Sequence, residues 1–240
     1  MKCVIASCSL VLSVLVQQLA AAEPAVATPV PPGTVFHFAG MVYVAGRIEF
    51  RDPSGGLWPN YFYEGKWGQV RGKMVFDPQS PQSDLDLTCT RLCQPDGGEY
   101  KVLGELMQKE KTPTARFTVI KVGPWEPCGE KDPKAGPYQM LPVEGRLDVD
   151  GRAVSVKGRG RVRYNLPGGG DLRGLHSNAF LGTSIHLMAD FTVQGKDLGL
   201  KKAADKPIQV TVYARAYTES TLLQVTKKKT LAEALEGKKR

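Results

Sequence analysis

The chain has 240 residues, of which 42% are hydrophobic, and a formal net charge of +8. That length and hydrophobic content exclude a chain too small to bury a core, so we expect one domain with an ample interior. The excess of basic residues fits anionic partners, but the N-terminus predicts an exported protein and argues against nucleic acid.

The N-terminal residues have the pattern of a secretory signal peptide. Lys2 supplies a short basic region, residues 4–16 are mostly apolar, and Ala20–Ala22 form a small-residue cleavage site. A membrane anchor is the alternative, but the apolar stretch is short and Gln17 interrupts it. We therefore predict a signal peptide over 1–22, a Pro- and Ala-rich linker over 23–33, and a mature protein that is periplasmic or secreted and soluble.

Three cysteines, Cys89, Cys93 and Cys128, remain after signal cleavage. An oxidising compartment permits a disulfide, and the odd number leaves one thiol over. Cys89 and Cys93 would lie about 13 Å apart in an extended chain, too far to bridge, so Cys128 is expected to pair with one of them. A Cys-x-x-x-Cys metal site is the alternative, but no further His or Cys lies at ligand spacing, and we predict no metal.

Apolar and polar residues alternate in several segments, which predicts β-strands with one buried face. In chain order these strands are expected at 35–50 (one strand or two), 69–76, 84–90, 116–122, 183–193 and 208–217. One helix is predicted over 100–111, where Leu103, Leu106 and Met107 have helical spacing. Residues 124–142 contain five prolines and are expected to form a long loop, and residues 222–240 a frayed basic tail or a short helix.

The clearest local signal is a long hairpin over 143–164 with Asp150–Gly151 as its turn. A type I′ turn needs positive φ at both central residues, which the Asp-Gly sequence accepts. This turn predicts a register that pairs Val149 with Arg152, Leu147 with Val154 and Gly145 with Val156. The apolar residues of both arms then share one face, whereas Lys157, Arg159, Arg161 and Arg163 point the other way.

The predicted strands do not alternate with helices. Doubly wound and TIM-barrel folds are therefore excluded, and an antiparallel barrel or sandwich is favoured.

Several short motifs follow one another in a characteristic order. Gly65-Lys66-Trp67 leads into Val70–Asp77, and Leu103–Glu110 precedes Pro113 and Phe117. Gly145, Leu147 and Gly151 lie in the hairpin, and Phe191 is followed by Leu198-Gly199-Leu200. In this order, over roughly 35–217, the motifs resemble those of the YceI-like family of exported, lipocalin-like proteins. The chain departs from that pattern at Asp150, where the family often has a histidine, and in the 125–142 and 168–170 loops.

The resemblance implies an all-β fold with one short helix, an extended antiparallel up-and-down β-barrel over 34–218 that resembles the lipocalins. A basic tail over 219–240 follows it. It also implies that the barrel holds a long isoprenoid lipid, such as a quinone chain, and performs no chemistry on it. That lipid or quinone is the one bound molecule that we expect, and we predict no other cofactor.

The residues expected to line the lipid tunnel are the apolar ones on the inward faces of the predicted strands. They are Val70, Met74, Phe76, Leu85, Leu87, Phe117, Val119, Leu147, Val154, Val156, Val162, Ile185, Leu187, Phe191, Val210 and Val212. The same faces carry four glycines, at 72, 145, 158 and 160, which would leave open volume for a ligand. The alternative is that these glycines let the strands bend at barrel corners.

The opposite face of the hairpin carries a basic row formed by Lys157, Arg159, Arg161 and Arg163. This row would give transient contact with a membrane surface or with a protein partner. The alternative is a solvated strand face that resists aggregation.

Catalytic motifs are not found in the sequence. The three histidines, His37, His176 and His186, have no acidic or cysteine companion at catalytic spacing. Gly168–Gly170 is not followed by the Lys-Ser/Thr pair of a phosphate loop. We therefore predict that the protein is not an enzyme and has no catalytic residues.

Two other functions are alternatives to the lipid carrier. One is an interaction or stress-response module whose barrel is filled by its own side chains and whose basic face and tail bind a partner. The other, an integral outer-membrane barrel, is disfavoured because the outward faces carry rows of charge where lipid contact requires apolar residues. The oligomeric state stays open, with a dimer among the alternatives.

Overall fold

The computed structural model describes residues 30–39, 46–51, 61–65, 69–77, 79–93, 114–126, 131–132, 136–137, 139–164, 184–201 and 203–236. The strands within these residues are β1 (Val35–Phe38), β2 (Gly46–Arg51), β3 (Tyr61–Gly65), β4 (Val70–Arg71), β5 (Lys73–Val75), β6 (Gln82–Ser83), β7 (Asp86–Cys89), β8 (Arg91–Cys93), β9 (Ala115–Val122), β10 (Lys131–Asp132), β11 (Gly136–Pro137), β12 (Gln139–Val149), β13 (Arg152–Tyr164), β14 (Ser184–Gln194) and β15 (Pro207–Tyr217). The helices are a 3₁₀ helix, η2 (Gly195–Leu198), and two α-helices, α2 (Glu219–Thr226) and α3 (Leu231–Glu236). None of the helices in this part of the chain is long and apolar enough to cross a membrane.

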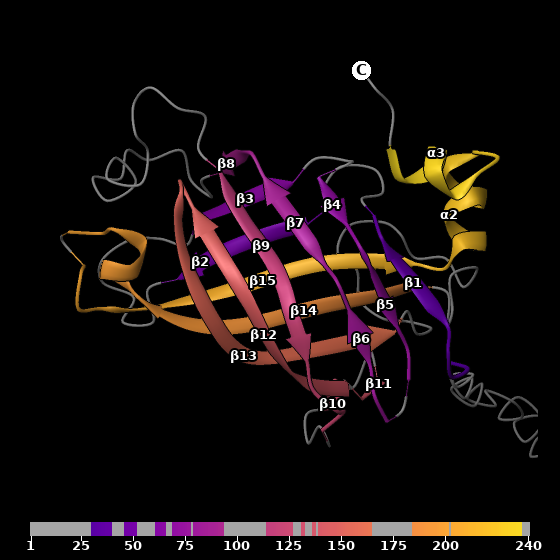
Figure 1. Ribbon diagram of the computed structural model, residues 1–240, viewed down its shortest axis with the longest axis horizontal. Coiled ribbons are helices and arrows are strands. Elements are labelled where there is room, and N and C mark those ends of the chain that lie inside the picture. The colour runs from indigo at the N-terminus through magenta and orange to yellow at the C-terminus, as the bar shows by residue number, and fades with distance from the viewer. Residues whose placement is uncertain are drawn as a thin grey trace, which may run out of the picture.

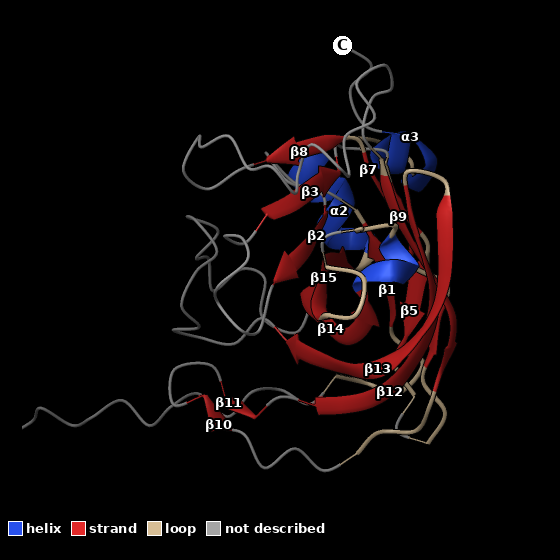
Figure 2. Ribbon diagram, turned by 90° about the vertical axis from the view of Figure 1, so that its left-hand side faces the viewer, coloured by secondary structure: helices blue, strands red, loops and turns tan. Residues whose placement is uncertain are grey.

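The strands form an antiparallel barrel in which β12, β13, β14 and β15, consecutive in the chain, lie side by side (Figure 1). β1 pairs with β5, and β5 pairs with β6. β2 pairs with β3, and β3 pairs with β8. β4 pairs with β7. β7, β9, β12, β13, β14 and β15 then pair in succession. β15 closes the ring, because its other edge pairs with both β1 and β2. The predicted all-β, up-and-down, lipocalin-like fold is confirmed, and Figure 2 shows the strands curving around a common interior.

Gly72 is the bend at which the strand β4–β5 changes partners. β4 pairs with β7, whereas β5 pairs with β1 and β6. Gly72 has a φ of +102°, and a Cβ atom there would lie 2.4 Å from the backbone oxygen of Asp84. Both conditions require glycine. At this position the glycine serves to bend the strand rather than to widen the interior.

The hairpin has the predicted turn and register. Asp150 and Gly151 have φ values of 50° and 84°, as a type I′ turn requires. Val149 pairs with Arg152, Leu147 with Val154 and Gly145 with Val156. β12 and β13 extend this pairing to Gln139 and Val162, so the hairpin begins earlier than predicted.

The prediction that residues 124–142 form one loop is wrong in part. β12 begins at Gln139, and β10 and β11 form a two-stranded ribbon before it. Proline has no N–H to donate to a neighbouring strand. Pro142 is tolerated in β12 because it precedes Val143, whose pairing with Val122 is the last pairing between β12 and β9. The predicted signal peptide and the helix expected over 100–111 lie outside the described residues.

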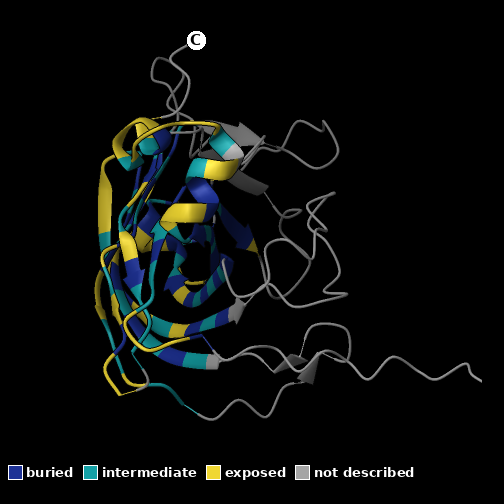
Figure 3. Cartoon of the chain, turned by 90° about the vertical axis from the view of Figure 1, so that its right-hand side faces the viewer, coloured by how far each residue is buried: buried dark blue, intermediate teal, exposed yellow. Residues whose placement is uncertain are grey.

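The inward side chains of the strands form one continuous core. Buried and exposed residues alternate along the strands, with the period of two that a barrel wall requires (Figure 3). A second, smaller cluster lies on the outside of the barrel, where Leu222 of α2 and Ala234 of α3 pack with Ala39 and Tyr217. The helices therefore cover the outer surface beside β1 and the end of β15 (Figure 1), and the short-helix alternative for the C-terminal segment is confirmed.

Candidate functional site

The interior of the barrel is the first candidate site. Fourteen of the sixteen predicted lining residues are buried, and Phe76 and Val154 are half-buried and pack against the same core. Four buried polar side chains occur in the described part of the chain. Glu49, Ser184 and Thr211 occupy outward strand positions, and Thr221 belongs to α2. The inward face is thus apolar at every buried position.

The described lining residues are closely packed. Among the buried lining residues the largest exposed fraction is 7%, at Val119. Phe117 and Phe191 pack against each other with ring centroids 5.1 Å apart. A Cβ on Gly145 would lie 2.5 Å from the Phe117 ring. A Cβ on Gly158 would lie 2.0 Å from the backbone oxygen of Asp190 and 2.8 Å from the Phe191 ring. The Phe117 ring therefore takes up the space beside Gly145, whereas Gly158 is needed first because the backbone of β14 lies so close to it.

The predicted basic row is matched by acidic residues. Lys157 Nζ lies 3.1 Å from Glu144 Oε1, and Arg159 Nε lies 3.7 Å from Glu126 Oε2. Arg161 makes a closer ion pair, with its Nη2 2.8 Å from Asp190 Oδ2. The side chain of Arg163 lies outside the described part of the structure. Three of the four predicted cations thus have carboxylate neighbours, and the row by itself carries little uncompensated charge.

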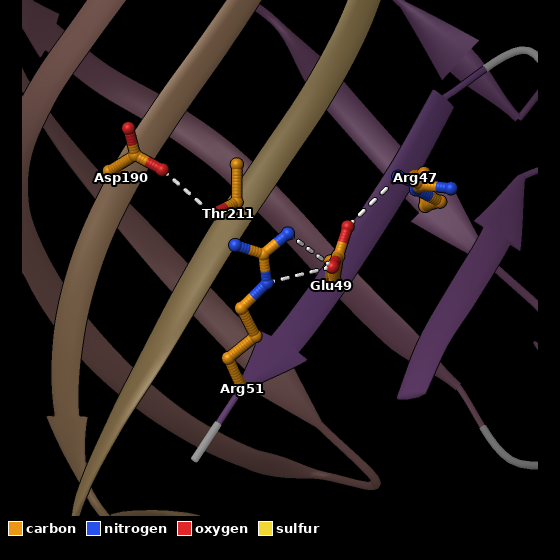
Figure 4. Close-up of polar contacts among 5 residues, drawn as sticks. All are labelled: Arg47, Glu49, Arg51, Asp190 and Thr211. Carbon is orange, nitrogen blue, oxygen red and sulfur yellow. Dashed lines mark hydrogen bonds and ion pairs between the residues drawn. The ribbon is translucent and has the colours of Figure 1, made fainter. Parts of the chain in front are cut away.

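A polar network that the sequence analysis did not single out lies on the outside of β2, β14 and β15 (Figure 4). Arg47 Nη2 donates to Glu49 Oε2 at 2.9 Å, and Arg51 donates from Nε and Nη2 to Glu49 Oε1 at 3.0 and 2.9 Å. Thr211 Oγ1 donates to Asp190 Oδ1 at 2.7 Å. The Glu49 side chain is only 7% exposed, although it points outward. Its two arginines therefore cover it and are held in place by it.

The electrostatic effects in this network follow from that arrangement. The hydrogen bond to Glu49 raises the pKa of Arg51. Burial raises the pKa of Tyr213, with a further contribution from the charge of Glu49, while Arg47 opposes it. Arg47 lies over the Tyr213 ring, 4.8 Å from its centroid. The alternating charges of Arg47-Ile48-Glu49-Phe50-Arg51 are the sequence signal that could have identified the network.

The remaining candidate residues do not form a reactive centre in the described part of the chain. No group of three metal-ligating side chains occurs there. Burial lowers the pKa of His37, opposed by the charge of Glu219. Cys89 is buried in the core, and Cys128, the predicted disulfide partner of Cys89 or Cys93, lies outside the described residues.

Comparisons with known proteins identify no family for this chain. No protein-family model and no curated protein matches it. A crystal structure of Burkholderia cenocepacia BcnA is similar to it, with a TM-score of 0.41 and 12% sequence identity, covering 71% of this chain and 96% of that chain. At this level of similarity, the fold assignment rests on the strand pairing of the chain itself.

Proposed function

We propose that the protein is an exported, non-catalytic carrier that holds a long apolar lipid, of isoprenoid or quinone type, inside its barrel. The observation that carries this proposal is the apolar inward face, which continues around the barrel without a polar side chain among its buried residues. Such a face offers no hydrogen bond or charge to orient a polar ligand, so it selects for hydrocarbon. The order of motifs that resembles the YceI-like family supports the same class of ligand.

The dimensions of the barrel favour a chain over a compact ligand. β12, β14 and β15 have 11 residues each and β13 has 13. At about 3.3 Å per residue and a typical strand tilt, this corresponds to a barrel roughly 25–30 Å deep. Burial of a hydrocarbon chain over that depth would stabilise the complex by about 25 cal/mol per Å² of apolar surface, less the cost of ordering the ligand.

The ligand would take the place of side chains that fill the interior in the ligand-free protein. Phe117 and Phe191 are the side chains best placed to move, because each ring lies beside a glycine and can turn about its own side-chain bonds. Rotation of the two rings would open a lengthwise space without changing the backbone pairing. The proposal therefore requires the rings to change rotamer when the lipid enters.

Native mass spectrometry of the protein purified from its exported fraction, followed by organic extraction, tests the proposal. We expect a co-purifying isoprenoid in stoichiometric amount. If the protein is free of lipid and stays so after incubation with quinones of several chain lengths, the carrier function is wrong.

A second candidate function has an observation in its favour. The near-zero exposure of the inward residues is what a barrel filled permanently by its own side chains would show. Such a barrel would serve as a rigid module that binds partners through its outer surface. The two functions predict different effects of a larger side chain in the interior. In a carrier, Leu147→Trp abolishes lipid binding, whereas in a permanently filled barrel it lowers the stability of the protein.

A further inference from the structure

The barrel wall has a seam between β6 (residues 82–83) and the end of β9 (residues 120–122). Among the described strands β6 pairs only with β5, although it lies beside the C-terminal end of β9 (Figure 1). The Val119 N–H donates to the Leu85 carbonyl oxygen at 2.8 Å. Beyond this bond β9 has a β-bulge at Ile120, where its pairing with β12 shifts between Glu144 and Gly145. A bulge bends its strand and interrupts the ladder, so the seam lacks the backbone pairing that joins β7 to β9.

The side chains at the seam differ from those of the rest of the wall. Ile120 is 65% exposed and places an apolar group at the outer edge, and Val119 is the most exposed of the buried lining residues. On the inner side, Ser83 shares the inward face with Met74, with which it pairs. The Ser83 hydroxyl oxygen is buried and has no hydrogen-bond partner among the described residues. Such a hydroxyl costs free energy that a hydrogen bond from a ligand would recover.

The side chain of Trp125 bridges the seam at the end of the barrel. Backbone hydrogen bonds from Gly123 and Glu126 to β12 hold its segment on the β9 side. Its indole Nε1 donates to the carbonyl oxygen of Asp77, which follows β5 on the other side of β6, at 2.8 Å. Its ring packs against Phe76, with centroids 5.8 Å apart. One side-chain hydrogen bond and one ring contact therefore join the two sides of the seam here.

The opposite end of the barrel is closed by backbone, where η2 connects β14 to β15. Leu198, Leu200 and Ala203 are buried there against the core. The N–H groups of Gly195 and Leu200 donate to backbone carbonyl oxygens at 2.9 Å, and the backbone at Ala203 leaves no room for a Cβ on Gly195. Opening this end would break backbone hydrogen bonds and expose three buried side chains. Opening the seam requires only that the Trp125 indole rotate about its side-chain bonds.

We propose that the cargo enters and leaves the barrel through this seam, with Trp125 as its latch and Ser83 as the partner of the cargo's polar head. The choice of an isoprenoid as the occupant rests on the proposed function. The hydrocarbon chain passes Ile120 and Val119 into the apolar interior, and the head group stays at the seam, where it hydrogen-bonds to the Ser83 hydroxyl. The ligand class is therefore an isoprenoid with one hydrogen-bonding head, such as a polyprenol or a quinone, rather than a pure hydrocarbon.

Hydrogen exchange of the ligand-free protein tests the opening itself. The amide of Val119, whose hydrogen bond lies at the seam, should be protected less than the amides of Gly195 and Leu200 at the η2 end by about tenfold or more. Trp125→Ala should lower the protection of Val119 further and leave the two η2 amides unchanged. If the η2 amides exchange first, the seam is not the opening, whether or not the protein binds lipid.

The rates of lipid uptake and release test the latch. Time-resolved native mass spectrometry of the mature chain with a quinone should show both rates about tenfold higher in Trp125→Ala, with little change in Kd, because a latch affects entry and exit alike. Leu198→Ala is the matched control at the η2 end and should keep the wild-type rates. Unchanged rates in Trp125→Ala, or the same increase in both variants, would overturn the entrance.

The head-group contact is tested with three isoprenoids: a polyprenol, a quinone, and squalene, which has no head group. Ser83→Ala should weaken binding of the first two by about fivefold, the worth of one hydrogen bond, and leave squalene binding unchanged. The control is Ser155→Ala, which removes an exposed hydroxyl from the outside of β13 and should bind all three lipids like the wild-type protein. An equal effect of Ser83→Ala on all three lipids would exclude the contact.

The results separate this inference from the carrier function. If none of the three lipids binds the wild-type protein, the carrier function is refuted, and the exchange comparison alone decides whether the barrel opens at the seam. If the lipids bind but Trp125→Ala changes neither rate, the carrier function stands and the entrance is wrong.

Discussion

Asp150 and Thr114 are joined by a reciprocal pair of hydrogen bonds. The Thr114 N–H donates to Asp150 Oδ1 at 2.8 Å, and the Asp150 N–H donates to the Thr114 carbonyl oxygen at 3.0 Å. Asp150 lies in the turn of the β12–β13 hairpin, and Thr114 lies immediately before β9. The pair therefore fastens the turn to the strand that follows β7 in the barrel. The side chain of Asp150 therefore has a role besides its turn propensity, because its carboxylate accepts the hydrogen bond from Thr114.

The first prediction concerns the side chain of Asp150. Asp150→Ala should lower the free energy of unfolding by about 2 kcal/mol, because it removes one hydrogen bond and places alanine at a φ of 50°. Asp150→Asn keeps the acceptor oxygen and tolerates the left-handed conformation, so it should stay close to the wild-type value at neutral pH. Urea unfolding followed by circular dichroism measures both. Equal losses in the two variants would contradict the role of the hydrogen bond.

The second prediction is the pH dependence of the same site. Burial raises the pKa of Asp150, the bond from Thr114 opposes this, and the charge of Asp148 adds to the increase. A carboxyl whose folded pKa is raised favours folding most below its unfolded pKa of about 3.9, and that contribution is lost as pH rises through the folded pKa. The Asp150→Asn variant should therefore gain stability relative to the wild-type protein between about pH 4 and pH 7. Unfolding midpoints measured across this range test the sign, and a wild-type advantage that grows with pH would refute it.

The third prediction distinguishes a ligand tunnel from a permanently filled barrel. Leu147 is fully buried and inward-facing on β12. If its surroundings rearrange to admit a lipid, Leu147→Trp should occupy the tunnel, abolish isoprenoid binding and leave the protein folded. Leu187→Trp, on β14, should behave in the same way. A loss of stability of more than about 3 kcal/mol in both variants would instead indicate a core that cannot yield.

The fourth prediction addresses the aromatic rings that fill the interior. Phe117→Ala should cost about 3–5 kcal/mol in the lipid-free protein because it leaves a cavity. Added isoprenoid should restore more of this loss than it restores in Phe50→Ala, a matched control with an equally buried ring on β2. Thermal unfolding with and without ligand gives the comparison. The same recovery in both variants would show that the ligand does not occupy the place of the Phe117 ring.

The fifth prediction tests the closure of the barrel at Gly72. Gly72→Ala should lower the free energy of unfolding by more than about 2 kcal/mol, since the residue has a φ of +102° and its new methyl group would meet Asp84. Gly33→Ala is the control, with a φ of +81° and no atom near the position of the methyl group. It should show only the backbone cost, about 1 kcal/mol. If the two variants are equally stable, the contact with Asp84 does not constrain the strand.

The sequence by itself determined the features that depend on neighbouring residues. The Asp150–Gly151 turn sets the register of the hairpin, and the alternation of apolar residues sets the face that each strand buries. Both signals are local, because turn geometry involves two residues and strand periodicity repeats every second one. These local signals are sufficient to predict an antiparallel barrel or sandwich and most of its inward residues, and the family resemblance chose the barrel.

The tertiary structure decided what depends on contacts between distant segments. Three features join residues far apart in the chain: the pairing of β15 with β1 and β2, the packing of Phe117 against Phe191, and the ion pair of Arg161 with Asp190. A glycine on an inward face looks the same in the sequence whether the space beside it is empty or filled, since the ring that fills it comes from another strand. The same holds for charge: Arg161 belongs to a basic row in the sequence, and only the closed barrel brings Asp190 within 2.8 Å of it.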